Sequence, residues 1–183
     1  MQKLIITLIK AFSLTELMIV VAIAAFISAI AIPNYKIYIN KANVTDMIST
    51  MDPCQVQVYQ YFLQNGSFPD GSTVPVTCYG QTIPSGSMSA ALKEGITASY
   101  TVSGTNTSNN YYADFTVNHP SVMAISATGA STTTPANLHI RLKQTNATSA
   151  GGGGDLQYQC GVVTSDPNQV PSKYLPSACT ASF

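Results

Sequence analysis

The chain reads FSLTELMIVVAIAAFISAIAI from Phe12 to Ile32, and this stretch decides the architecture of the protein. Its polar side chains are Ser13, Thr15, Glu16 and Ser28. In a helix, these residues span about 31 Å, which is enough to cross the hydrocarbon core of a bilayer. A carboxylate inside such a helix costs about 3 kcal/mol on insertion scales, so we expect Glu16 to have a function and a partner.

An ordinary secretory signal peptide is the alternative interpretation of this segment. Lys3 and Lys10 precede the apolar run, and Ala29–Ala31 has the small-residue pattern of a cleavage site. Glu16 counts against it, because a charge in the apolar region weakens insertion. The run also continues smoothly into a helix-like segment without a polar stretch before the cleavage point. We therefore favour a retained helix over 12–32.

The helical pattern continues beyond the span as an amphipathic segment over 33–65. Asn65–Gly66 is a plausible end, with Pro69 shortly after it. One helix is therefore predicted from Phe12 to about Gln64, with its second half packed on a sheet. Apolar residues recur at helical spacing at Ile37, Val44, Ile48, Met51, Val58 and Phe62.

The remainder, 66–183, is predicted to form a globular head. The stretch from Gly66 to about Lys93 is interrupted by prolines and glycines, and we expect a loop with little regular structure. Alternating apolar and polar residues then predict strands near 96–102, 111–117, 122–127, 138–142 and 156–162. The predicted fold class is α+β: a long N-terminal helix packed on an antiparallel sheet of about four strands.

The four cysteines all follow the apolar span, at Cys54, Cys78, Cys160 and Cys179. An even number of cysteines beyond a span predicts two disulfides in an oxidising compartment. Three pairings are possible, and we favour Cys54–Cys78 with Cys160–Cys179 because each closes a local loop. A structural zinc site is the alternative, but no CxxC pair exists and the spacings do not fit.

Charge and motif content argue against catalysis and nucleic-acid binding. Only 9% of the residues are charged and the formal net charge is zero. No phosphate-binding loop, HExxH or GxSxG motif occurs, and the acidic residues do not form a calcium loop. His119 and His139 are isolated. Arg141 and Lys143 share one strand face, which is more typical of a solvated face than of a DNA site. We therefore predict no enzymatic activity, no cofactor, no metal and no DNA binding.

The stretches Phe12–Ala24 and Ala31–Tyr35 together resemble the start of a type IV pilin, in the type IVa branch. This resemblance implies that 1–11 is a leader peptide, cleaved between Ala11 and Phe12, and that the new amine of Phe12 is methylated. The residue before the cut is usually Gly in this family, whereas here it is Ala11. Glu16 occupies the position of the family's assembly glutamate.

Two further features fit the same family. Pro33 and Pro53 lie where type IVa pilins carry helix prolines, and each removes an intrahelical hydrogen bond, so we expect a kink at both. The segment 160–179 resembles the disulfide-bounded loop near the C-terminus of many type IVa pilins. Lys3 and Lys10 before the span place the N-terminus in the cytoplasm and send the head across the membrane.

The resemblance implies a structural subunit that assembles by helix packing into a surface filament. Such pili serve adhesion, twitching motility, biofilm formation or DNA uptake. The implied partners are other copies of the chain, a prepilin peptidase that also methylates, and an assembly platform in the inner membrane. The precursor is expected in the bacterial inner membrane and the assembled form at the cell surface. Two alternatives remain: a pseudopilin of type II secretion, or a minor pilin acting as a tip adhesin or DNA receptor.

Overall fold

The computed structural model describes residues 12–86, 90–106, 108–125, 131–146 and 154–183. Contacts divide the chain into two compact units, with the boundary after Ile37. The predicted leader, including Ala11, lies outside the described residues, as does the end of the strand predicted near 122–127.

Helix α1 runs from Leu14 to Asn65, within two residues of the predicted ends. Gly66 ends it in the left-handed region, with φ of 69°. The N–H of Gly66 donates to the carbonyl of Phe62 at 2.8 Å, the hydrogen bond expected of a glycine after a helix. The helix is continuous through both of its prolines, and the predicted kinks there remain a prediction.

The second half of α1 buries one stripe of side chains against the head. The predicted stripe is confirmed at Val44, Met51, Val58 and Phe62, and Ile48 is half-buried. The opposite side of the helix leaves the side chains of Val56, Tyr59 and Leu63 exposed. The buried residues of α1 are Val44, Met47, Thr50, Met51, Cys54, Gln55, Val58 and Phe62.

Among the described residues, the head contains a two-stranded sheet and a six-stranded sheet. The strands are β1 (Val76–Cys78), β2 (Gln81–Ile83), β3 (Ala90–Ala91), β4 (Thr97–Ser103), β5 (Tyr112–Ile125), β6 (Ser131–Thr145), β7 (Asp155–Val162) and β8 (Ala181–Ser182). Two short 3₁₀ helices are η1 (Lys93–Gly95) and η2 (Ser172–Tyr174). The order in the larger sheet is β3-β4-β5-β6-β7-β8.

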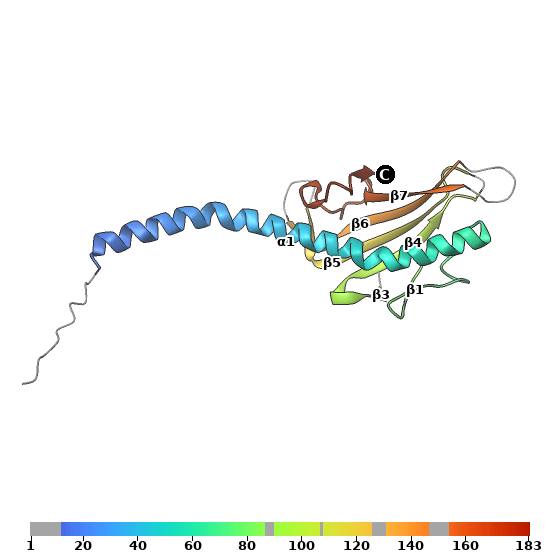
Figure 1. The fold of residues 1–183 in the computed structure, drawn as a ribbon, viewed down its shortest axis with the longest axis horizontal. Helices are drawn as coiled ribbons and strands as arrows, with labels where there is room; N and C mark the ends of the chain where they lie inside the picture. Colours follow the sequence, from blue (N-terminus) through green and yellow to red (C-terminus); the bar gives the residue numbers. More distant parts are fainter. Residues whose placement is uncertain (1–11, 87–89, 107, 126–130, 147–153) are drawn as a thin grey trace, which may run out of the picture. The chain divides into compact units, whose positions relative to one another are not determined.

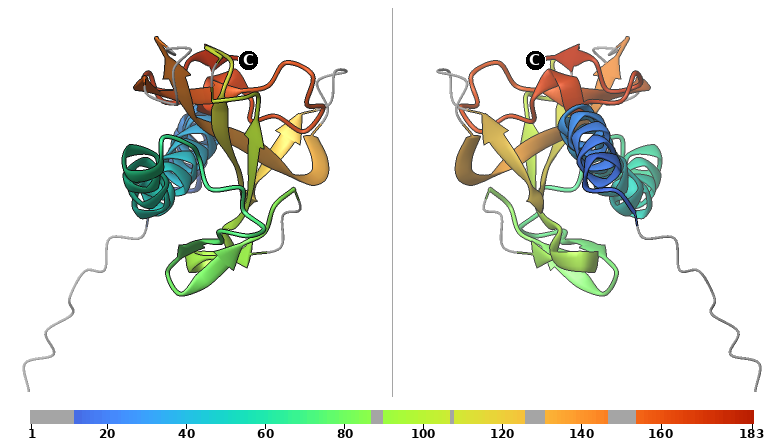
Figure 2. Two further views of the ribbon diagram at one scale, coloured as in Figure 1. Left: turned by 90° about the vertical axis from the view of Figure 1, so that its right-hand side faces the viewer. Right: turned by 90° about the vertical axis from the view of Figure 1, so that its left-hand side faces the viewer.

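The four central strands β4 to β7 pair antiparallel, which confirms the predicted sheet. Strand β8 adds to β7 in parallel, so the sheet is mixed. The two strands predicted near 111–117 and 122–127 are parts of one strand, β5, whose pairing register shifts between Asn118 and Met123. Figure 1 shows the second half of α1 lying along the sheet. In Figure 2, the green segment around β1 to β3 and the red C-terminal segment lie at opposite edges of the six-stranded sheet.

The prediction of little regular structure between Gly66 and Lys93 was wrong in part. Strands β1 and β2 form an antiparallel hairpin there, and β3 pairs with β4. The hairpin turn is Tyr79–Gly80, with both residues at positive φ, as a tight two-residue hairpin requires. Strands of two or three residues are too short to show alternation, and Tyr–Gly is a much weaker turn signal than Asn–Gly.

The two faces of the central sheet differ in character. Directly opposed residues point to the same face, so the register of β5 and β6 assigns each side chain to one of the two. The core face packs with α1 in one hydrophobic cluster. Its central residues are Ala113, Phe115 and Val117 on β5 and Leu138, Ile140 and Leu142 on β6. The polar face carries Asp114, Thr116, His139 and Arg141.

Two buried tyrosines attach the segment after α1 to the sheet. The hydroxyl of Tyr100 donates to the carbonyl of Pro69 at 2.9 Å. The N–H of Phe68 donates to the hydroxyl of Tyr111 at 2.9 Å. Burial raises the pKa of both phenols, so they remain protonated hydrogen-bonding groups at physiological pH.

Candidate assembly helix and C-terminal loop network

The first half of α1 exposes an apolar surface along its whole length. Every side chain from Phe12 to Lys36 is exposed, with Phe12 at 82%. Among the described residues, α1 is the one helix long and apolar enough to cross a membrane by length and composition, and its most apolar window has no buried residue. An apolar surface of this extent has to be covered by lipid or by other protein.

Glu16 lies in the first turn of α1, immediately before the uninterrupted apolar run. The N-terminal end of a helix carries partial positive charge, so an acidic side chain is favourable there. A shallow, solvent-open apolar hollow follows directly along the same helix. It is lined by Leu17, Met18, Val21, Ala22 and Ala25.

Both disulfides connect elements of the head in the local pairing favoured from the sequence. Cys54–Cys78 joins α1 to strand β1, with 5.3 Å between the Cα atoms. Cys160–Cys179 closes the C-terminal loop, with 4.4 Å between the Cα atoms. The loop predicted over 160–179 is therefore confirmed. Cys160 lies on β7, and β8 follows Cys179 and pairs with β7, so both ends of the loop are held at the sheet.

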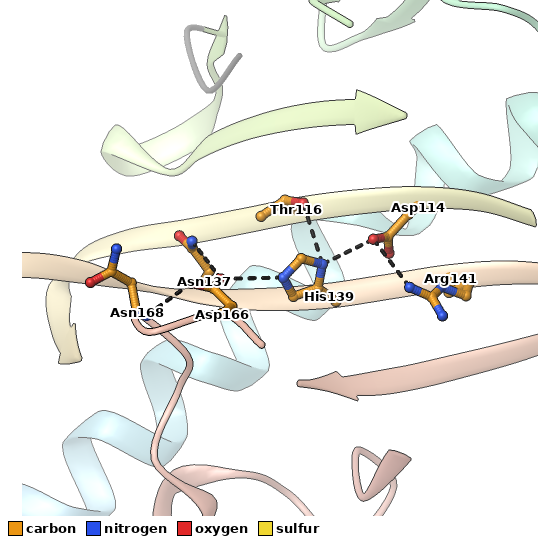
Figure 3. A network of polar contacts seen from close by, with 7 residues as sticks. All are labelled: Asp114, Thr116, Asn137, His139, Arg141, Asp166 and Asn168. Atoms are coloured by element: carbon orange, nitrogen blue, oxygen red, sulfur yellow. Dashed lines mark hydrogen bonds and ion pairs between the residues drawn. The ribbon is translucent and has the colours of Figure 1, made fainter. Parts of the chain in front are cut away.

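The C-terminal loop is attached to the polar face of the sheet through Asp166 (Figure 3). The side-chain amide of Asn137 donates to Asp166 Oδ2 at 2.9 Å, and the N–H of Asn168 donates to Oδ1 at 2.8 Å. The backbone of Asn137 also pairs with the loop, through its N–H to the carbonyl of Asn168 and its carbonyl to the N–H of Val170.

His139 lies between two carboxylates in this network (Figure 3). Its Nδ1 is 3.0 Å from Oδ2 of Asp114, and its Nε2 is 3.5 Å from Oδ2 of Asp166. The hydroxyl of Thr116 is 3.4 Å from Nδ1. The three charged or titratable side chains expose between 9% and 16% of their surface, so the contacts are largely shielded from water.

Burial and hydrogen bonding act in opposite directions on Asp166. Burial raises the pKa of this carboxyl group, but donors from Asn137, Asn168 and His139 outweigh burial. The resulting pKa of Asp166 lies below its ordinary value, so the carboxylate stays charged in mild acid.

Arg141 is enclosed and does not present its charge to solvent. Its guanidinium lies 3.9 Å from the ring centroids of both Tyr112 and Phe183, and Nη2 is 3.5 Å from Oδ2 of Asp114. The side chain is 12% exposed. Arg141 and Lys143 share a strand face as predicted, but they do not present two cations to solvent. The guanidinium of Arg141 is occupied by contacts within the head.

His139 and Arg141 were identified from the sequence, but the network that joins them was not. Alternation in β6 puts both on the polar face, and this was visible in the sequence. The two partner carboxylates come from β5 and from the loop after β7, and no local pattern indicates those pairings.

His119, the other histidine, accepts a hydrogen bond from the N–H of Ser121 at 3.1 Å and is not part of the network. No group of three or more His, Cys, Asp or Glu side chains in the described part of the chain is arranged to hold a metal ion.

The family model described as pilin (bacterial filament) matches residues 40–180, and the chain belongs to the pilin family. The match covers the second half of α1 and the sheet, whereas the N-terminal resemblance rests on residues 12–35. The two therefore support the same family from different parts of the chain. The type IV pilin resemblance inferred from the sequence is confirmed. Pilins are structural proteins, in agreement with the prediction that this chain is not an enzyme.

The individual relatives are type IV pilins and related proteins. A type IV major pilin protein PilE1 of Neisseria gonorrhoeae is 39% identical over 67 residues, which are 37% of this chain and 41% of that relative. A type IV major pilin protein PilE of the same organism is 25% identical over 191 residues, covering 97% of each. The prepilin peptidase-dependent protein D of Escherichia coli K12 is 44% identical over 57 residues, 31% of this chain and 39% of that one.

The chain spans about two fifths of the length of the PilE1 relatives it matches. No solved structure matches the chain significantly.

Proposed function

We propose that this chain is the structural subunit of a type IV pilus and assembles through the first half of α1. The observation that carries the proposal is the exposed apolar surface from Phe12 onward, with one carboxylate at Glu16. In the precursor, lipid covers this surface in the inner membrane. In the assembled pilus at the cell surface, the helices of other copies cover it.

Processing supplies the partner that Glu16 needs. Cleavage between Ala11 and Phe12, followed by methylation of the new amine, leaves a positive charge about one helical turn before Glu16. Both charges are unfavourable in an apolar environment, and each is neutralised by the opposite charge of a neighbouring copy. The pairing fixes the axial register of the helices, and the apolar hollow beside it accepts side chains of the neighbour.

The remaining partners follow from the family. A prepilin peptidase that also methylates Phe12 processes the precursor, and an assembly platform in the inner membrane builds the filament. The leader over 1–11, the membrane and filament-core helix over 12–32, the amphipathic helix over 33–65 and the head over 66–183 are the proposed functional divisions. Uses in adhesion, twitching motility, biofilm formation or DNA uptake are proposed from the family alone.

Substitution of Glu16 tests the assembly proposal. Glu16→Ala leaves the neighbour's amine unpaired in an apolar environment, and an unpaired buried charge costs several kcal/mol. We expect the yield of sheared surface filaments to fall at least tenfold while the cells retain the processed subunit in the membrane. Asp46→Asn, which removes an acid from the same helix beyond the apolar run, is the matched control and should assemble normally. Normal filament yield and register in Glu16→Ala would refute the pairing.

A further inference from the structure

The position of His139 between Asp114 and Asp166 has a chemical consequence that depends on its protonation. A neutral imidazole has one N–H and can donate to one partner, whereas an imidazolium has two and can donate to both. Both ring nitrogens of His139 face a carboxylate oxygen, at 3.0 Å and 3.5 Å. The observed arrangement is therefore the one that a protonated His139 satisfies fully.

The charges in the site support the same assignment. Asp114 faces His139 from β5, Asp166 from the loop after β7, and Arg141 lies beside it on β6. A charged His139 balances two carboxylates with two cations, whereas a neutral ring leaves one excess negative charge in a largely buried site. On the neighbouring strands, Gly161 of β7 lies directly opposite His139 and contributes no side-chain charge.

Asp166 connects His139 to the loop, because its carboxylate contacts His139 and also accepts a hydrogen bond from the loop backbone. Its carboxylate is held by Asn137 on β6 and holds the backbone of Asn168 in the loop. A pocket of about 450 Å³ begins one residue later and opens to solvent. It is lined by Val162, Gln169, Val170, Pro171, Ser172 and Lys173.

We propose that Asp114, His139 and Asp166 form a pH-sensitive latch, the His139 latch, which holds the loop over 163–170 against the sheet when His139 is protonated and loosens it when His139 is neutral. The shape of the neighbouring pocket then depends on the protonation state of His139. All three residues of the latch belong to the head, outside the first half of α1.

The direction of the effect follows from proton linkage. A charged His139 can donate to both carboxylates and a neutral ring to only one, so the charged form favours the closed loop. On the acid side, the lowered pKa of Asp166 keeps that carboxylate charged in mild acid, and its contribution is lost as the pH falls through its value in the folded chain. On the acid side, the latch is therefore limited by protonation of Asp166.

Amide hydrogen exchange on the full chain in nonionic detergent measures the latch directly. Protection factors for the loop over 163–170, corrected for the intrinsic pH dependence of exchange, are compared between about pH 5 and pH 8, the range in which histidines ordinarily change charge. We expect protection to fall roughly tenfold at the higher pH, the effect of losing one charge-assisted hydrogen bond. Protection of β5 should not change.

Two variants separate the latch from a general effect of pH. His139→Gln keeps polar atoms at the site but cannot titrate, so its loop protection should be independent of pH. His119→Gln removes the other histidine and should retain the tenfold change of the wild type. A pH-independent wild type, or the same pH dependence in His139→Gln, would overturn the proposal.

Side-chain ¹⁵N chemical shifts of His139 provide a test that needs no variant. In the wild-type chain, both ring nitrogens should report the protonated form under the conditions in which loop protection is high. The shifts should change to a neutral form over the same pH interval in which protection is lost. A His139 that is neutral while the loop is protected would overturn the latch, even if His139→Gln failed to fold.

Discussion

Replacing Arg141 by methionine tests whether the enclosed guanidinium stabilises the head. Arg141 supplies a positive charge to Asp114 and stacks between the rings of Tyr112 and Phe183. Methionine retains much of the apolar stem and can contact both rings, but it removes the charge. The substitution therefore isolates the electrostatic role of the side chain.

The magnitude follows from what remains at the site. Removing one partner of a buried ion pair costs about 3–5 kcal/mol, because the other charge is left uncompensated. Asp114 keeps its contact with His139, which places the expected cost at the lower end, and each lost cation–π contact adds up to about 1 kcal/mol. We expect the free energy of unfolding to fall by about 3–5 kcal/mol in Arg141→Met.

Urea unfolding of the full chain in nonionic detergent provides the assay. Tyrosine fluorescence is the signal, since the chain has 10 tyrosines and no tryptophan. Lys143→Met, two residues further along the same strand face, is the control and should change stability by less than about 0.5 kcal/mol. In the double variant Arg141→Met with Asp114→Asn, the loss of unfolding free energy should be smaller than the sum of the losses in the two single variants. A loss below about 0.5 kcal/mol in Arg141→Met would refute the role given to the guanidinium.

Three further predictions concern the C-terminal segment. The variant Cys160→Ser with Cys179→Ser should lose about 3 kcal/mol in urea unfolding, because the disulfide closes a loop with a sequence separation of 19; a loss below about 1 kcal/mol would contradict this. Asp166→Asn should be less stable than the wild type at neutral pH, and the difference should shrink below about pH 4. The reason is that a carboxylate with a lowered pKa stabilises the folded chain above its unfolded pKa. This stabilisation is lost as the pH falls through the pKa in the folded chain. A constant difference across that range would show that its charge has no part in stability. Gly161→Ala should cost about 1–3 kcal/mol because a Cβ there would collide with the carbonyl oxygen of Ala181 on β8; an unchanged melting temperature would exclude the clash.

The long helix and the main strands could be predicted because their patterns are local and repeated. The apolar run from Phe12 to Ile32 and the stripe ending at Phe62 extend over many turns, so their periodicity identifies a helix before any tertiary contact is known. Alternation in β4, β5 and β6 works in the same way. Short elements such as β1 and β8 contain two or three residues and form because a disulfide or a neighbouring strand holds them.

The polar network could not be predicted, for a different reason. Asp114 and His139 are 25 residues apart, and His139 and Asp166 are 27 apart. Their contact depends on the register between β5 and β6 and on the path of the loop after Cys160. The sequence indicates that His139 and Arg141 share a face, but the choice of partners is made by tertiary structure.

We propose that this chain is processed and exported as a filament subunit. The most direct test is the intact mass and the N-terminal residue of the protein in sheared surface material. We expect a chain that begins at N-methylated Phe12 and contains both disulfides. A chain that begins at Ile32 and is found free in the medium would show an ordinary signal peptide and would contradict the role of Glu16. An N-methylated chain confined to the inner membrane would contradict export in a filament.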